Sequence, residues 1–118
     1  MNYKLFTYGT LMKGECRHDI LKDAEYLGDA VLRDYCLLEI GSFPGAVPEE
    51  GSRVYGEVYE IPGSLIPYLD RVEGEGYLYK RKTVHVSIND NDTEVLFYEF
   101  IRDDGSYEKS TAEGKWTA

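Results

Sequence analysis

The stretch KRKTVHVSINDNDTEVLFYEFI, residues 80–101, decides the fold class of this chain. Residues rich in β-branched and aromatic side chains stand on both sides of Asn89–Asp92, and these four residues are all turn formers. The pattern predicts two antiparallel strands, residues 80–88 and 94–101, joined as a hairpin. The fold is therefore expected to be built on a sheet.

Four earlier stretches show the same strand pattern, and long helical periodicity is nearly absent. The strands expected there are Lys4–Tyr8, Glu25–Val31, Tyr35–Glu39 and Arg53–Glu60. One helix is predicted from Ser64, which can cap it, to Gly74, which can end it; its apolar face consists of Leu65, Ile66, Leu69 and Val72. A second, shorter helix is expected around residues 17–22.

These elements make an α+β protein, with a single domain over residues 1–118. The hydrophobic fraction of 42% is enough for one core that needs no disulfide or metal cross-link. From about residue 103 the periodicity ends, and we expect a polar, loosely held tail with Trp116 as an anchor on the body. The pattern leaves open whether the sheet stays open or curls into a small barrel that covers its edges.

The charge balance excludes some classes of partner. Lys plus Arg number 13 against 22 Asp plus Glu, and the net charge of −9 repels phosphate backbones and anionic membranes. We therefore expect no nucleic acid and no membrane partner. The sequence starts without a signal-peptide pattern and has no run of about 18 apolar residues, which indicates a cytoplasmic protein. A monomer or a weak homodimer is expected in solution.

Metal and cofactor sites are not expected either. Cys16 and Cys36 lack a CxxC partner and are interpreted as reduced thiols, with Cys36 as a small buried hydrophobic residue. His18 and His85 stand alone, without HxxxH or HExxH spacing. The chain also has no G-x-S-x-G elbow and no Gly-rich phosphate loop.

The first candidate for chemistry is Tyr8-Gly9-Thr10-Leu11, which directly follows an apolar strand. Gly9 permits a sharp backbone turn, and successive backbone N–H groups in such a turn can converge on an anion. A carboxylate, or a carbonyl oxygen that develops negative charge, would suit this nest. Equally, the glycine can mark an ordinary turn at the end of a strand.

The second candidate is Glu73, at the expected C-terminal end of the helix and next to Gly74. A helix C-terminus carries partial negative charge, so a carboxylate there has its proton affinity raised, and Asp70 and Glu75 would add to this. A general acid/base needs such a carboxyl group. The alternative is a solvated surface acid.

Two further stretches can contribute to a site. A tyrosine of Tyr77–Arg81 can hold the carboxyl group or line a pocket, and it can equally be ordinary strand packing. Gly41–Pro48 is interpreted as a rigid loop with two prolines. Such a loop can form the wall of a small-molecule pocket or simply connect two strands.

Five motifs at comparable spacing together resemble the γ-glutamylcyclotransferase-like family, which includes γ-glutamylamine cyclotransferase and avirulence-induced-gene-like proteins. They are Phe6–Leu11, Phe43–Pro48, Val54–Tyr59, Leu69–Gly74 and Tyr79–Arg81. The resemblance covers residues 4 to about 101. It implies a small mixed β-barrel with a few short helices packed outside.

The resemblance also implies an enzyme that releases 5-oxoproline from γ-glutamyl amines or peptides. The family's catalytic glutamate falls on Glu73. Its substrate loop falls on Tyr8, Gly9, Thr10 and Leu11, and the expected substrate contacts include Pro44 and Tyr79. Tyr79 is expected to orient Glu73, and Phe43 stands where a Tyr before Pro is common.

This chemistry needs few groups because the nucleophile is the α-amino group of the substrate itself. Glu73 would take a proton from it and deliver one to the departing amine. The alternative is a non-catalytic module on the same scaffold that binds a small amino-acid-like ligand, which has no need of an acid at that helix end. A third interpretation, an interaction protein with an exposed Tyr-rich face, predicts no pocket.

Overall fold

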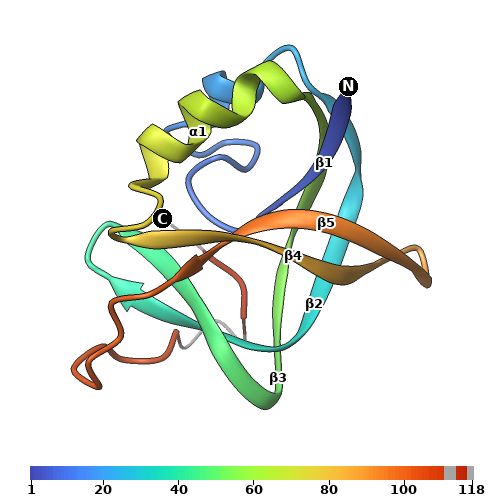
Figure 1. The fold of residues 1–118 in the computed structure, drawn as a ribbon. Coiled ribbons are helices and arrows are strands. Elements are labelled where there is room, and N and C mark those ends of the chain that lie inside the picture. The colour runs from blue at the N-terminus through green and yellow to red at the C-terminus, as the bar shows by residue number, and fades with distance from the viewer. Residues whose placement is uncertain (111–113, 117–118) are drawn as a thin grey trace.

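The computed structural model describes residues 1–110 and 114–116. Five strands, one α-helix and two short 3-10 helices make up the described chain (Figure 1). Their bounds, in chain order, are β1 Asn2–Thr7, η1 His18–Leu21, β2 Glu25–Ile40, β3 Phe43–Pro62, η2 Gly63–Leu65, α1 Ile66–Glu73, β4 Tyr79–Ile88 and β5 Asn91–Phe100. The expected strand-dominated α+β fold with short helices is confirmed.

The strands pair in the order β1-β3-β2-β4-β5, and the sheet closes on itself where β5 meets β1. The closing pairing is parallel and joins Leu5 to Leu96. The predicted hairpin of β4 and β5 is confirmed, since these strands pair antiparallel from Tyr79–Phe100 to Ile88–Asn91. Asn89 and Asp90 form its turn with φ of 49° and 67°, a conformation that Asn and Asp tolerate.

Two of the expected strands are one long strand. β2 covers both Glu25–Val31 and Tyr35–Glu39, because the chain passes Asp34 as a register shift without leaving the sheet. Asp34 has a φ of 66°, as a residue at a bulge or kink can have. The turn-forming residue therefore bends the strand and does not end it.

The expectation of a loop over Gly41–Pro48 is wrong from Phe43 onwards, where β3 begins. Over residues 43–48 this strand pairs with β2, while its pairing with β1 starts only at Glu57. A proline is tolerated where one strand edge has no ladder to join. Gly45 is also needed there, because a Cβ atom would lie 2.7 Å from the ring of Phe100.

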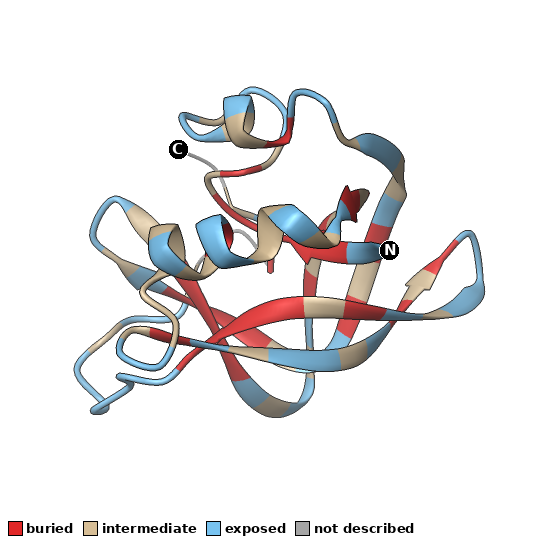
Figure 2. Ribbon diagram, turned by 45° about the horizontal axis from the view of Figure 1, so that its top comes forward, coloured by how far each residue is buried: buried red, intermediate tan, exposed pale blue. Residues whose placement is uncertain are grey.

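The helix α1 packs across one end of the sheet (Figure 2). Leu69 is its buried residue, with 0% of its surface exposed. Leu69 belongs to a core cluster with Leu5, Ile61 and Phe100, which come from three strands. Ser64 does not cap the helix as expected, since it lies in η2, and no side chain caps α1. The predicted end is confirmed, because Gly74 is left-handed with φ 64° and ψ 48°.

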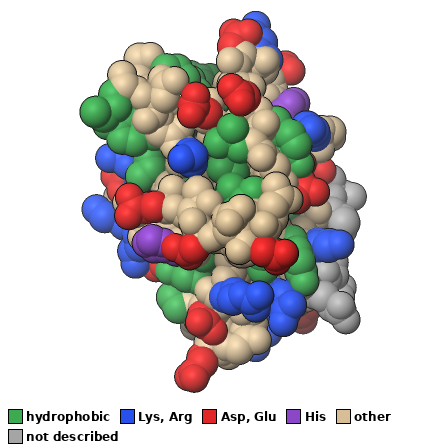
Figure 3. Space-filling model, turned by 90° about the vertical axis from the view of Figure 1, so that its right-hand side faces the viewer, with side chains coloured by type: hydrophobic (Ala, Val, Ile, Leu, Met, Phe, Trp, Pro, Cys, Tyr) green, Lys and Arg blue, Asp and Glu red, His purple; other side chains and the backbone are tan. Residues whose placement is uncertain are grey.

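The short helix expected at residues 17–22 is a single 3-10 turn, η1, which begins after Arg17. No helix within residues 1–110 and 114–116 is long and apolar enough to cross a membrane. Acidic and basic side chains are interspersed on the face shown in Figure 3. That face presents no continuous basic surface of the kind that binds phosphate backbones.

Of the expected loosely held tail, residues 108–110 and 114–116 are in fact attached to the body, while residues 111–113 and 117–118 lie outside the described residues. Glu39 donates its backbone N–H to the Glu108 carbonyl, Ser110 donates to Leu37, and Tyr55 donates to Gly114, each at 2.9 Å. These bonds attach residues 108–110 to β2, where Lys109 forms an isolated bridge with Leu38, and attach Gly114 to β3. Trp116 does dock, as expected: it is partly buried, packs against the core, and its Nε1 lies 3.3 Å from Glu15 Oε1.

Candidate active site

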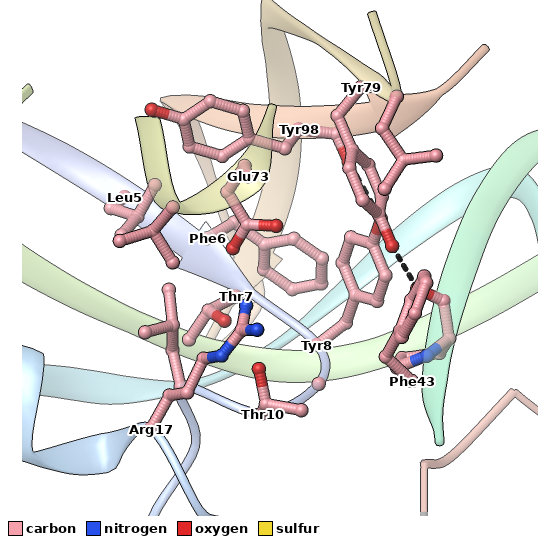
Figure 4. A pocket seen from close by; sticks show the side chains of 15 residues that line it. Leu5, Phe6, Thr7, Tyr8, Thr10, Arg17, Phe43, Glu73, Tyr79 and Tyr98 are labelled. Carbon is pink, nitrogen blue, oxygen red and sulfur yellow. Dashed lines mark hydrogen bonds between the residues drawn. The ribbon is translucent and has the colours of Figure 1, made fainter. Parts of the chain in front are cut away.

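The end of β1 and the end of α1 meet at one pocket, although they lie more than 60 residues apart in sequence. Its empty volume is about 600 Å³, including the part open to solvent. All seven residues predicted for the site line it: Tyr8, Gly9, Thr10, Leu11, Pro44, Glu73 and Tyr79. Figure 4 shows the Glu73 carboxyl group directed into this pocket. The interpretation as an interaction protein predicted no pocket, and this pocket counts against it.

Glu73 is the last residue of α1, and the wall around it is mainly aromatic and aliphatic. Burial raises the pKa of Glu73 to about 7, and the positive charge of Arg17 opposes this rise. A carboxyl group with this pKa exists in both protonation states near neutral pH. It can therefore accept and return a proton.

The cause of the raised pKa differs from the one predicted. Asp70 is engaged by Arg81 Nη1 and by the Tyr98 hydroxyl, the latter at 2.7 Å. Glu75 accepts the backbone N–H of Arg81 at 3.2 Å and lies 3.6 Å from Lys80 Nζ. Both acids are compensated by their own partners, so burial controls the pKa of Glu73.

The Tyr8–Leu11 loop is a turn in which Met12 donates its backbone N–H to the Gly9 carbonyl at 3.1 Å. Within the part of the chain that the structure describes, the N–H groups of Gly9, Thr10 and Leu11 have no acceptor. Such successive unpaired donors beside a pocket can bind a carboxylate or an oxyanion.

Gly9 is needed for a reason other than the one predicted. Its φ is not positive, so the turn itself does not require glycine. A Cβ atom on Gly9 would instead lie 2.8 Å from Pro44 Cγ. The absence of a side chain brings the loop against the wall formed by Pro44.

The two predicted tyrosines are held by backbone groups. The Tyr8 hydroxyl donates to the Tyr98 carbonyl at 2.6 Å and accepts the Ala46 N–H at 3.1 Å. The Tyr79 hydroxyl donates to the Pro44 carbonyl at 2.6 Å (Figure 4). The Tyr79 hydroxyl therefore donates its hydrogen to Pro44. The expectation that Tyr79 orients Glu73 is not met by a hydrogen bond between them.

Comparison with known proteins identifies the family. The family described as γ-glutamyl cyclotransferase, AIG2-like matches residues 5–118. The chain belongs to this family. It is 35% identical over 81 residues to the γ-glutamylcyclotransferase family protein YtfP of Escherichia coli K12, which covers 69% of this chain and 71% of that protein. It is also 35% identical over 94 residues to the γ-glutamylaminecyclotransferase of Bos taurus, covering 71% of this chain and 56% of that protein.

Solved structures agree with this assignment. The crystal structure of YkqA from Bacillus subtilis matches with a TM-score of 0.80 and 30% identity, covering 98% of this chain and 40% of that one. An AIG2-like protein from Mus musculus matches with a TM-score of 0.86, covering 98% and 88%. At 20% identity the second likeness shows the fold alone. Membership of the γ-glutamyl cyclotransferase family supports a cyclotransferase enzyme.

Sequence reasoning missed part of this cyclotransferase-family pocket. Arg17, Val72, Leu78 and Tyr98 also line it. Val72 lies in the predicted helix and Tyr98 in a predicted strand, and neither position carries a sequence signal of a pocket. Arg17 follows the Tyr8–Leu11 loop closely, and its backbone N–H donates to the Thr10 carbonyl at 2.8 Å. This proximity to the loop was the signal that could have found it.

A metal centre has no candidate residues in residues 1–110 and 114–116, where no group of three or more His, Cys, Asp or Glu could hold an ion. Cys36 is buried and Cys16 exposed, and both are free thiols. Burial raises the pKa of the Cys36 thiol. Glu73 is the one carboxyl group and Arg17 the one guanidinium group among the described residues that line the pocket, beside the backbone N–H donors of the loop and the hydroxyl groups of threonine and tyrosine side chains.

Proposed function

We propose that this chain is a γ-glutamyl cyclotransferase that releases 5-oxoproline from γ-glutamyl amines or peptides, with Glu73 as the general acid/base. One observation carries the proposal: Glu73, whose pKa is about 7, shares a pocket with the unpaired N–H groups of Gly9, Thr10 and Leu11. A proton carrier and an oxyanion site are the two groups that this reaction requires of a protein.

The reaction begins when the Glu73 carboxylate takes a proton from the α-ammonium group of the substrate. The freed amine attacks the γ-carbonyl carbon and closes a five-membered ring, and the carbonyl oxygen becomes negatively charged. The loop N–H groups donate to this oxygen. The bond from the same carbon to the departing nitrogen then breaks as that nitrogen takes a proton from Glu73.

Atoms and charges balance without another reactant. The α-ammonium nitrogen loses two protons on its way to the ring N–H: Glu73 carries the first to the departing nitrogen, and the second, lost from the ring nitrogen after the attack, passes through water to the released amine, which leaves as an ammonium group. No enzyme nucleophile takes part, since substrate binding already holds the amine near the carbonyl carbon.

The closed strand order supports the small barrel that the family resemblance implies, and we include this barrel in the proposal. The two free thiols, one of them exposed, support a reducing compartment such as the cytoplasm. We also propose that the protein is a monomer or a weak homodimer, which analytical ultracentrifugation tests.

The deciding experiment measures 5-oxoproline from a panel of γ-glutamyl amines, γ-glutamyl dipeptides and glutathione, with the wild type and with Glu73→Gln. The amide matches the carboxyl group in shape but cannot shuttle a proton. We expect Glu73→Gln to keep its fold and much of its ligand affinity and to lose at least about 10²-fold in kcat.

Glu75→Gln is the matched control, because Glu75 pairs with Lys80 and does not line the pocket. We expect it to be nearly silent. If Glu75→Gln lost activity while Glu73→Gln stayed active, the general acid/base would be Glu75 and the assignment to Glu73 would be wrong. Ligand binding without turnover in the wild type would identify the protein as a binding module.

A further inference from the structure

Arg17 is the one cationic side chain among the described residues that line the pocket. It precedes η1 and is itself exposed, so it lies at the open side of the pocket. In Figure 4 its side chain runs past Thr10 and directs the guanidinium group toward the Glu73 carboxyl group. Its charge also acts on Tyr79, on the opposite wall.

The guanidinium group acts on Glu73 through its charge but forms no ion pair with it. Within residues 1–110 and 114–116, Arg17 forms no ion pair and its side chain makes no hydrogen bond. Arg81, by contrast, is paired with Asp70, and Arg102 donates to the Tyr77 carbonyl. A guanidinium group at a pocket mouth, with its donors unused, is suited to a carboxylate that arrives with the ligand.

The two charges of the pocket match the head group of an amino acid. The γ-glutamyl group carries an ammonium and a carboxylate on the same carbon atom. If the ammonium meets Glu73, the carboxylate on the same carbon atom comes within reach of Arg17, because the Arg17 guanidinium group is directed toward Glu73. The loop N–H groups then remain available for the γ-carbonyl oxygen.

We propose that Arg17 binds the α-carboxylate of the γ-glutamyl group and so selects substrates in which that carboxylate is free; this inference rests on the proposed function. Arg17 and Glu73 together hold both ends of the head group. This fixes the amine next to the proton carrier and in reach of the carbonyl carbon. Compounds whose α-carboxylate is blocked as an amide are bound poorly.

The catalytic test compares the best γ-glutamyl substrate with the same compound whose α-carboxylate is converted to a carboxamide. The wild type should prefer the carboxylate by about 10- to 100-fold in kcat/KM, the range expected for a charge-assisted hydrogen-bonded pair. Arg17→Gln should lose most of this preference by losing activity on the carboxylate alone. Arg17→Lys, which keeps the charge but not the planar fork, should retain part of it.

The matched control is Arg33→Gln, which removes the same charge from an exposed position of β2 outside the pocket. It should keep the wild-type preference. An electrostatic effect of Arg17 on Glu73 acts on both compounds equally and cancels in the comparison. Equal losses on both compounds in Arg17→Gln would overturn the proposal.

A binding test separates this inference from the proposed function because it needs no turnover. Calorimetry measures the affinity of wild type and Arg17→Gln for 5-oxoproline and for its carboxamide. We expect Arg17→Gln to weaken the binding of 5-oxoproline about 10- to 100-fold and to leave the carboxamide unchanged. If this result is obtained and no substrate is turned over, Arg17 is still the carboxylate-binding residue but the proposed enzymatic function is refuted. If the wild type does not bind 5-oxoproline more tightly than the carboxamide, the proposed role of Arg17 is overturned.

Discussion

Burial of a single carboxyl group connects the chemistry of the pocket with the stability of the chain. In the folded protein the pKa of Glu73 is about 7, whereas an unperturbed glutamate has a value of 4.5. The folded state therefore holds this proton more tightly than the unfolded state does. Between these two pKa values the stability must fall as the pH rises, because the unfolded chain loses the proton first.

The first prediction concerns Glu73→Gln and the pH dependence of stability. Below pH 4.5 the wild-type carboxyl group is protonated in both the folded and the unfolded state, so its burial costs no stability through ionisation. Above pH 7 it is ionised in both states, and the full cost of burying the charge lowers the stability of the folded protein. The unfolding free energy of Glu73→Gln relative to the wild type should rise by roughly 3 kcal/mol from pH 4 to pH 8. Denaturant unfolding at the two pH values measures this. If the difference in unfolding free energy between Glu73→Gln and the wild type were the same at both, the pKa of Glu73 would not be raised by folding.

The second prediction concerns activity and pH. Since Glu73 must be deprotonated to accept a proton, kcat/KM should rise with pH through a midpoint near 7. Arg17 lowers the pKa of Glu73 against the effect of burial, so Arg17→Gln should move this midpoint to higher pH. Arg33→Gln should leave the midpoint in place. A midpoint near 4.5 in the wild type would remove Glu73 as the titrating group.

At the scale of elements, a small polar network holds the helix that carries Glu73. Asp70 lies three residues before Glu73 in α1, and it accepts from Arg81 on β4 and from Tyr98 on β5. Burial of Asp70 works against its ionisation, but these two hydrogen bonds lower its pKa below the usual value. The network attaches the end of α1 to the hairpin of β4 and β5.

The third prediction follows from this attachment. Asp70→Asn removes the charge that holds Arg81 and Tyr98, which should lower the unfolding free energy by about 1–3 kcal/mol. The end of α1 should also shift, and kcat should fall by on the order of 10-fold, because small displacements of a catalytic group are costly. Lys80→Gln, which removes an exposed ion pair with Glu75, is the control and should change neither quantity appreciably. If Asp70→Asn lost stability but kept its kcat, the network would stabilise the fold without positioning Glu73.

The same elements show what the sequence can and cannot predict. The hairpin of β4 and β5 was predictable, because alternation and turn formers coincide there. β3 was not predictable at Phe43–Pro48, because tolerance of its prolines depends on which edge of the strand is paired, and that is a tertiary property. The motifs placed Glu73 and the Tyr8–Leu11 loop, whereas the unpaired guanidinium of Arg17 emerges only when the chain folds around the pocket.

At the scale of the whole molecule, the C-terminal segment ties distant parts of the chain together. Its backbone bonds to β2 and β3, and Trp116 reaches Glu15, in the segment between the Tyr8–Leu11 loop and η1. Gly114 packs closely against the backbone of Arg53 in β3, since a Cβ atom on Gly114 would lie 2.1 Å from the Arg53 carbonyl oxygen. The tail therefore fits against β3 only with glycine at this position.

The last prediction compares Gly114→Ala with Gly105→Ala. Both glycines have a positive φ, 88° and 86°, so both variants carry the same backbone strain of about 1 kcal/mol. Only Gly114 also meets a backbone atom, whereas nothing lies within 4 Å of a Cβ on Gly105. Gly114→Ala should therefore lose clearly more unfolding free energy, about 2–3 kcal/mol, because the bond from Tyr55 is also broken.

Trp116 gives a direct reading of the same event, since it is the single tryptophan of the chain. In Gly114→Ala the tail should leave β3, and the emission of Trp116 should shift to the red as the ring enters water. In Gly105→Ala the emission should match the wild type. Equal stability losses in the two variants, with unchanged emission in both, would mean that the contact of Gly114 with Arg53 does not hold the tail.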